Sequence, residues 1–89
     1  YRMMDEAIRF LDESSDKPFF LYLPLIEPHV ALHPPLERLN DFPAEWDTEM
    51  YRGENGYLPT ARPRAAYAAL VTDIDSYVGR ILDKLDQLK

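Results

Sequence analysis

Hydrophobic residues recur at helical intervals near both ends of the chain, and an unbroken hydrophobic run lies between them. In residues 1–15 the hydrophobic positions are three and four residues apart, namely Met4, Ala7, Ile8 and Leu11. This spacing predicts an amphipathic helix over 1–15. We expect the helix to end before Pro18, because proline biases the residue before it towards extended backbone.

The clearest periodicity lies in residues 64–88. Hydrophobic residues alternate there at intervals of four and three: Tyr67, Val71, Ile74, Val78, Ile81, Leu85 and Leu88. Together with Pro63, which suits a first helical turn, this pattern predicts a long helix over 64–88. Two kinds of packing remain possible for this helix. It could lie on a sheet, which the extra hydrophobic residues Ala66, Ala69 and Leu70 favour, or it could form a coiled coil.

Residues 18–25 contain five consecutive hydrophobic residues, Phe19 to Leu23, between two prolines. Such a run is typical of a strand that is buried on both faces, as in a parallel sheet between helices, and a half-buried antiparallel strand is the alternative. The predicted order is therefore helix, core strand, a long loop over 26–63, and helix. This order indicates an α/β fold.

Composition and charge exclude several classes of function. The 89 residues include ten Lys or Arg and sixteen Asp or Glu, which give a net charge of −6. An acidic chain repels phosphate backbones, so no nucleic-acid binding is predicted. No hydrophobic run approaches the roughly 18 residues of a membrane span. The chain has no cysteine, which excludes disulfides and thiolate chemistry within it and leaves the compartment undetermined.

His29 is the ionisable residue of most interest, because it follows the carboxyl end of the predicted strand by a few residues. In open α/β sheets, ligands bind outside the carboxyl ends of the strands. An imidazole there can donate a hydrogen bond to an anionic oxygen or to a leaving group. The alternative is a loop histidine bonded to a nearby carbonyl, and spacing alone favours that alternative.

The neighbours of His29 add no metal site. His33 lies four residues away, a spacing that brings two ligands together on a helix, but Pro28 and the two prolines after His33 oppose a helix there. Glu27 could pair with an imidazole or coordinate a cation, although such a residue is more often solvated or caps a turn. No metal site is predicted in this chain.

Charged residues near the long helix have structural explanations. Asp73 and Asp75 are two positions apart on the predicted helix, so they face different directions and form no carboxylate dyad. Arg62 and Arg64 could meet an anion, although a solvated or helix-capping role is favoured. No Gly-rich phosphate loop and no Ser-centred nucleophile elbow is present.

Five segments together resemble a known family. They are Lys17-Pro-Phe-Phe-Leu-Tyr-Leu, Glu27-Pro-His-Val-Ala-Leu, Gly56-Tyr-Leu-Pro, Arg64-Ala-Ala-Tyr-Ala-Ala-Leu-Val and Asp75-Ser-Tyr-Val-Gly-Arg-Ile-Leu. Each is weak alone, but in this order and spacing they are similar to consecutive parts of the type I, arylsulfatase-like sulfatases of the alkaline-phosphatase superfamily. The resemblance implies a sulfuric ester hydrolase with an alkaline-phosphatase-like fold.

The resemblance also implies roles for particular residues. In that family the histidine of a Pro-His motif contacts the sulfate ester, and His29 is the matching position, so it is expected to bind substrate and assist catalysis. The proline common two residues after this histidine is Ala31 here. His33 has no family role that can be transferred.

The family's formylglycine nucleophile arises from a Cys/Ser-x-Pro-x-Arg motif, and acidic residues hold its calcium. No such nucleophile motif occurs here. We therefore expect an internal segment of a sulfatase catalytic domain that binds neither group and is inactive without the rest of the domain. Relatives are often exported, which does not fix the compartment.

Two other functions remain open: a related phosphoryl or phosphonate hydrolase, and a non-catalytic helical module that associates through the heptads between Tyr67 and Leu88. Under each of these functions, a strand that belongs in the middle of a sheet exposes both edges when its neighbouring strands are missing. The isolated chain is therefore expected to self-associate.

Overall fold

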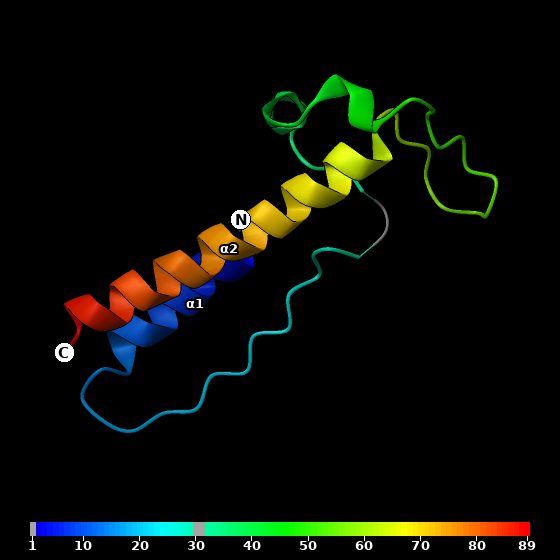
Figure 1. The fold of residues 1–89 in the computed structure, drawn as a ribbon. Coiled ribbons are helices and arrows are strands. Elements are labelled where there is room, and N and C mark those ends of the chain that lie inside the picture. The colour runs from blue at the N-terminus through cyan, green and yellow to red at the C-terminus, as the bar shows by residue number, and fades with distance from the viewer. Residues whose placement is uncertain (1, 30–31) are drawn as a thin grey trace. The chain divides into compact units, whose positions relative to one another are not determined.

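The computed structural model describes residues 2–29 and 32–89. Their regular elements are two α-helices and two short 3₁₀ helices, namely α1 (Arg2–Glu13), η1 (Leu36–Asp41), η2 (Ala44–Trp46) and α2 (Pro63–Gln87) (Figure 1). The chain divides into two compact units. The first contains Tyr1–Leu25 and Asp75–Lys89, and the second contains Ile26–Ile74, so α2 contributes to both.

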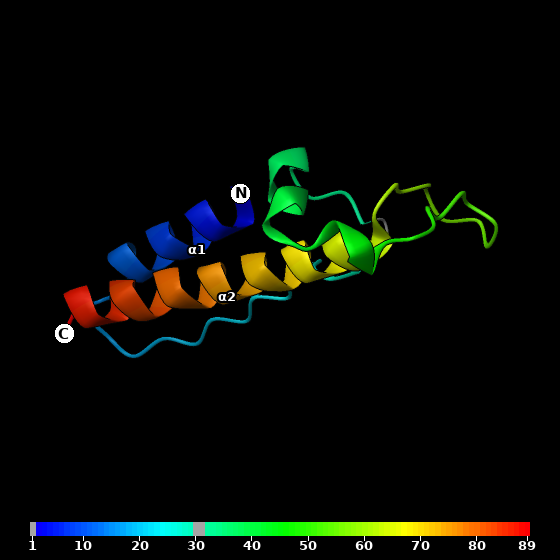
Figure 2. The same ribbon diagram turned by 45° about the horizontal axis from the view of Figure 1, so that its top comes forward.

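In the first unit, α1 lies beside the C-terminal part of α2, as Figures 1 and 2 both show. Met4, Ala7 and Leu11 are buried. They share one helix face because they are three and four residues apart. Burial of these side chains stabilises the unit more than its surface charges do, since exposed ion pairs contribute little.

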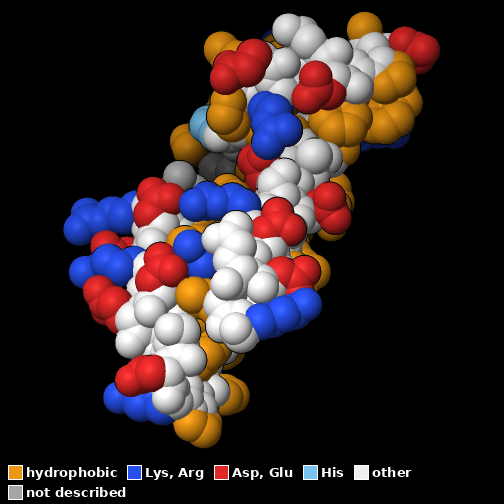
Figure 3. Space-filling model, turned by 90° about the vertical axis from the view of Figure 1, so that its left-hand side faces the viewer, with side chains coloured by type: hydrophobic (Ala, Val, Ile, Leu, Met, Phe, Trp, Pro, Cys, Tyr) orange, Lys and Arg blue, Asp and Glu red, His pale blue; other side chains and the backbone are white. Residues whose placement is uncertain are grey.

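Two cross-helix ion pairs show the direction of the helices in this unit. Arg80 lies 3.1 Å from Asp5, and Lys84 lies 3.1 Å from Asp12. The partners advance along both helices in the same direction, so α1 and this part of α2 run parallel. On the face shown in Figure 3, acidic and basic side chains lie interspersed, with hydrophobic side chains exposed among them.

The prediction of a buried core strand over residues 18–25 is not confirmed. The described residues form no strand in this segment, which is irregular chain between α1 and the turn at Glu27 (Figure 1). Phe20 and Tyr22 are 87% and 76% exposed, while Phe19 meets the ring of Phe10 edge-on with centroids 5.6 Å apart. A strand needs a hydrogen-bonded neighbour, and no described residue provides one. The described residues therefore show helices without the sheet of an α/β fold.

In the second unit, the first half of α2 buries its small residues. Ala65, Ala66 and Ala69 are at most 1% exposed. The preceding segment, 26–63, contains η1, η2 and an antiparallel bridge in which Tyr51 and Thr60 exchange two backbone hydrogen bonds of 2.9 Å. The predicted long loop thus has ordered structure of its own.

None of the described helices is long and hydrophobic enough to span a membrane.

The buried face of α1 predicts a large difference between two leucines. Leu11 is 1% exposed and Leu82 is 58% exposed. We expect Leu11→Ala to lower the free energy of unfolding by about 2–5 kcal/mol, because it leaves a cavity. Leu82→Ala should change it by less than about 0.5 kcal/mol. Urea unfolding of the chain followed by circular dichroism measures both, and equal losses would contradict the assigned core.

Candidate functional site

His29 lies in a tight turn at the start of the second unit. The backbone N–H of His29 donates to the carbonyl of Ile26 at 3.0 Å, and the Glu27–Pro28 peptide bond is cis. The side chain of His29 is exposed. Ala31, the position at which the resemblance departs from the common proline, lies outside the described residues.

Glu27 is partly buried in the same turn. Its Oε2 is shielded from solvent, and no described residue forms a hydrogen bond to it. A buried carboxylate oxygen is a strong acceptor and is costly to leave unpaired. The turn therefore combines an exposed imidazole with an acceptor that lacks a donor.

His33 has a separate position from His29. Its Nε2 is 3.3 Å from the carbonyl oxygen of Pro59, so it joins the segment after the turn to the segment before α2. Three hollows of about 350, 270 and 390 Å³ in this unit are lined by other residues than His29, among them Trp46, Tyr57 and His33. None of these three hollows is lined by both histidines.

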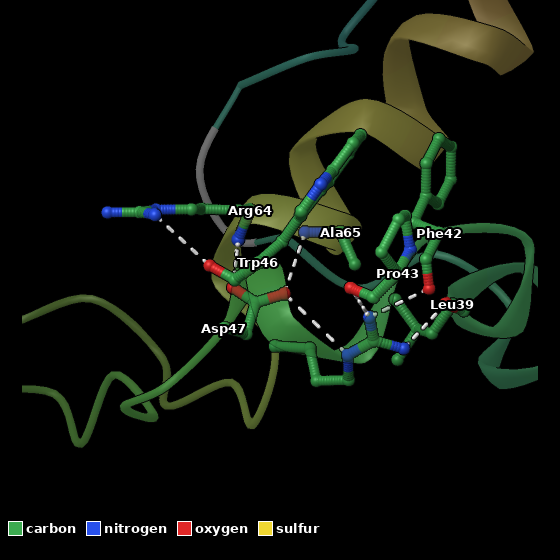
Figure 4. A network of polar contacts seen from close by, with 8 residues as sticks. Leu39, Phe42, Pro43, Trp46, Asp47, Arg64 and Ala65 are labelled. Carbon is green, nitrogen blue, oxygen red and sulfur yellow. Dashed lines mark hydrogen bonds and ion pairs between the residues drawn. The ribbon is translucent and has the colours of Figure 1, made fainter.

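The N-terminus of α2 is capped by a residue distant in sequence. Asp47 accepts the backbone N–H of Arg64 at 2.7 Å and that of Ala65 at 3.1 Å, one with each carboxylate oxygen (Figure 4). The first turn of a helix leaves its N–H groups without intrahelical partners, and Pro63 has none to satisfy. Asp47 therefore completes the hydrogen bonding of the first turn and places negative charge at the positive end of the helix dipole.

Arg62 links the segment that contains the two 3₁₀ helices, η1 and η2, to the same N-terminus of α2. Its guanidinium donates to the carbonyls of Leu39 at 2.6 Å, Phe42 at 3.1 Å and Pro43 at 2.9 Å (Figure 4). Its Nε lies 3.6 Å from Asp47 Oδ2, and the Asp47 side chain is fully buried. This guanidinium is engaged by protein groups, so Arg62 has a structural role and is not placed to meet an anion.

Arg64 also binds within the protein. Its Nη1 donates to the carbonyl of Trp46 at 3.1 Å, and its side chain is otherwise exposed. Arg62 thus fastens the chain before η2 to the start of α2, and Arg64 fastens the end of η2 to it.

Asp73 and Asp75 lie in different environments, as their spacing predicts. Asp73 is buried and pairs with Arg38 of η1, whereas Asp75 is exposed. The buried pair joins η1 to α2 inside the second unit. Asp73 is therefore a structural residue, and the two carboxylates form no dyad.

The comparison with protein families identifies the chain. The sulfatase family matches residues 1–89, which is the whole of it. The chain belongs to the sulfatase family. Membership implies an alkaline-phosphatase-like fold and a parent protein of the hydrolase class. A search of curated proteins finds no match to this sulfatase chain.

The family generally uses calcium and a formylglycine, and the residues of this chain do not fit either group. Among the described residues, no three of His, Cys, Asp or Glu gather as metal ligands. The sequence has no cysteine, and none of its serines is followed by the x-Pro-x-Arg pattern.

Asp47 and Arg38 are the residues that the sequence did not single out. One signal for Asp47 was present, because the helix begins at Arg62-Pro63-Arg64 without a Ser, Thr, Asp or Asn in the capping position. A missing local cap indicates that a distant side chain supplies it, although the sequence does not say which one.

The Asp47 cap predicts a local effect on stability. Asp47→Ala removes two hydrogen bonds to α2 and leaves the guanidinium of Arg62 without its carboxylate, so we expect a loss of about 2–4 kcal/mol. Glu49→Ala, at an exposed acidic residue two positions away, is the control and should cost less than about 0.5 kcal/mol. Hydrogen exchange in the first turn of α2 should accelerate in the Asp47 variant only. Equal exchange in both variants would contradict the cap.

Proposed function

We propose that this chain is part of the catalytic domain of a sulfuric ester hydrolase and that it contributes His29 to the substrate site. The observation that carries the proposal is the family match over residues 1–89. Its support in the structure is a turn closed by the His29 N–H, which leaves the imidazole at the surface of its unit. The nucleophile and the cation would come from residues outside this chain, which alone would hydrolyse nothing.

The proposed role of His29 follows from where charge develops in the reaction. Cleavage of the S–O bond increases negative charge on the bridging oxygen and on the sulfuryl oxygens. A hydrogen-bond donor already aimed at those oxygens stabilises the transition state more than the bound ester. An imidazole N–H is such a donor, and a protonated imidazole can also give its proton to a leaving oxygen.

Substitution of His29 in the full-length enzyme tests this role. We expect His29→Ala to lower kcat for a sulfate ester by roughly 100- to 1,000-fold, because one transition-state donor is lost. The thermal midpoint should change little, since the side chain is exposed.

His33→Ala is the matched control for that experiment. His33 is also exposed, and its Nε2 contacts the carbonyl oxygen of Pro59. Its turnover should stay within a few-fold of the wild type. Unchanged turnover in the His29 variant would remove His29 from the site. A marked preference of the wild-type enzyme for the phosphate ester of the same alcohol would favour a related phosphoryl hydrolase.

We also propose that the isolated chain self-associates, by strand pairing or through α2. Both surfaces carry large exposed hydrophobic side chains: Phe20 and Tyr22 in the irregular segment 18–25, and Val78 and Leu82 on α2. Light scattering after size exclusion should therefore give a mass above 10.4 kDa at high micromolar concentration. A strict monomer under those conditions would contradict the proposal.

Two variants distinguish self-association by strand pairing from self-association through α2. Tyr22→Pro interrupts strand pairing, because proline cannot donate to a ladder. Ile74→Lys with Ile81→Lys disrupts an assembly through the helix. The variant that restores the monomer identifies the surface.

A further inference from the structure

A loop in the second unit presents an asparagine followed by a glycine in an exposed turn. Asn55 and Gly56 are both exposed. The backbone N–H of Gly56 donates to the carbonyl of Gly53 at 3.1 Å and closes the turn, and the backbone N–H of Asn55 donates to the hydroxyl of Tyr51 at 2.9 Å. The antiparallel bridge between Tyr51 and Thr60 closes the loop as a whole. The hydrogen bonds within the turn thus involve backbone N–H groups and leave the side-chain amide of Asn55 open to attack.

The order asparagine then glycine is chemically reactive, because the next backbone nitrogen can attack the side-chain amide. The Gly56 nitrogen loses its proton and forms a bond to Cγ of Asn55, the Cγ–Nδ2 bond breaks, and Nδ2 leaves as ammonia. Water then adds to one of the two carbonyls of the cyclic imide and opens it to aspartate or isoaspartate. Water is the only co-reactant, and nothing is oxidised or reduced.

The structure leaves room for this attack at Gly56. Gly56 has a φ of +83°, and a Cβ at this position would meet no atom within 4 Å. Glycine has no side chain to shield its nitrogen, and it reaches backbone conformations that other residues do not. The hydrogen bond to Gly53 opposes the reaction, because it engages the attacking N–H. A single exposed backbone hydrogen bond contributes little net free energy, so we expect this turn to open readily.

Asn40 is the comparison within the same unit. It is exposed like Asn55, but Asp41 follows it, and both lie in η1. The Cβ of Asp41 shields the nitrogen that would attack, and the 3₁₀ helix must unwind before a ring can form. The N–H of Phe42 also donates to the carbonyl of Leu39 at 3.3 Å and fixes this end of η1. Exposure therefore does not distinguish the two asparagines, whereas the following residue and the backbone do.

We propose that Asn55 is a site of spontaneous deamidation and that the turn hydrogen bond from Gly56 to Gly53 limits its rate. The modification adds one negative charge to the loop, next to Glu54. It takes place on the exposed turn and involves no substrate, so it does not rest on the proposed function.

Mass spectrometry of the full-length protein tests the site. The folded protein is kept for several days in mildly alkaline buffer and then digested with an acid protease. We expect the peptide with Asn55 to lose the mass of an amino group and gain that of a hydroxyl, while the peptide with Asn40 stays unchanged. In Asn55→Gln the change should disappear, because cyclisation there needs a larger ring. An unmodified Asn55, or equal rates at Asn40 and Asn55, would overturn the inference.

Two glycine variants test the role of the turn. Gly53 has a φ of +98°, and a Cβ there would lie 3.2 Å from the carbonyl oxygen of Tyr57. Gly53→Ala therefore strains the turn, and we expect deamidation of Asn55 to accelerate by roughly two- to tenfold, the effect of losing one backbone hydrogen bond. Gly79→Ala is the matched control, since Gly79 lies in α2 and a Cβ there would meet no atom within 4 Å. Equal rates in the two variants would show that the turn does not limit the reaction.

The modified molecules report on the structural consequence. Ion exchange separates them, because they carry one more negative charge. Isoaspartate adds a methylene to the backbone of a loop that Tyr51 and Thr60 close with two hydrogen bonds. Hydrogen exchange at these two N–H groups should therefore be faster in the modified fraction. Equal exchange in both fractions would contradict this effect on the loop.

Discussion

Asp47 supplies the hydrogen bonds that the start of α2 cannot make for itself, and the order of the second unit depends on this contact. The carboxylate accepts two backbone N–H groups of the helix, at 2.7 and 3.1 Å, and its charge lies beside the guanidinium of Arg62. That guanidinium in turn holds three carbonyls of the 3₁₀ segment. These contacts hold η1 and η2 at the start of α2, because hydrogen-bonded polar groups that are buried fix their neighbours in place.

The two units differ in the contacts that hold their segments together. In the second unit, charged side chains pair with residues far apart in sequence, such as Arg38 with Asp73, although Glu27 Oε2 has no partner among the described residues. In the first unit, Phe20 and Tyr22 remain exposed beside a helix pair that buries only a few side chains. Exposed hydrophobic surface of this kind is typical of a face that packs against further protein. The family assignment agrees, since this fold surrounds a sheet with helices.

Local patterns predicted the helices but not the partners of the segments between them. The three- and four-residue spacing of Met4, Ala7 and Leu11 depends only on helix geometry, and those residues are buried as the spacing indicates. The run from Phe19 to Leu23 predicts a strand only if a neighbouring strand exists, and no described residue supplies one. A strand is a pairwise structure, so its hydrophobic pattern alone does not produce it.

At the candidate site, too, the sequence predicted local features but not contacts between distant segments. The resemblance of the motif around His29 to a known family indicated a sulfate-ester site, whereas the spacing of the residues alone favoured a loop histidine, and the sulfatase assignment agrees with that resemblance. The role of His29 itself stays a prediction. The sequence did not reveal that Glu27 Oε2 is shielded and unpaired, nor that Asp47 caps a helix that begins 16 residues later, because both depend on how distant segments pack.

The central claim is that His29 meets the sulfate group, and the most direct measurement is a crystal structure of the full-length enzyme with an unreactive sulfamate analogue bound. We expect an imidazole nitrogen of His29 to lie about 2.7–3.2 Å from a sulfuryl oxygen or from the atom that replaces the bridging oxygen. An imidazole that points away from the bound analogue, with other donors on all of its oxygens, would contradict the account.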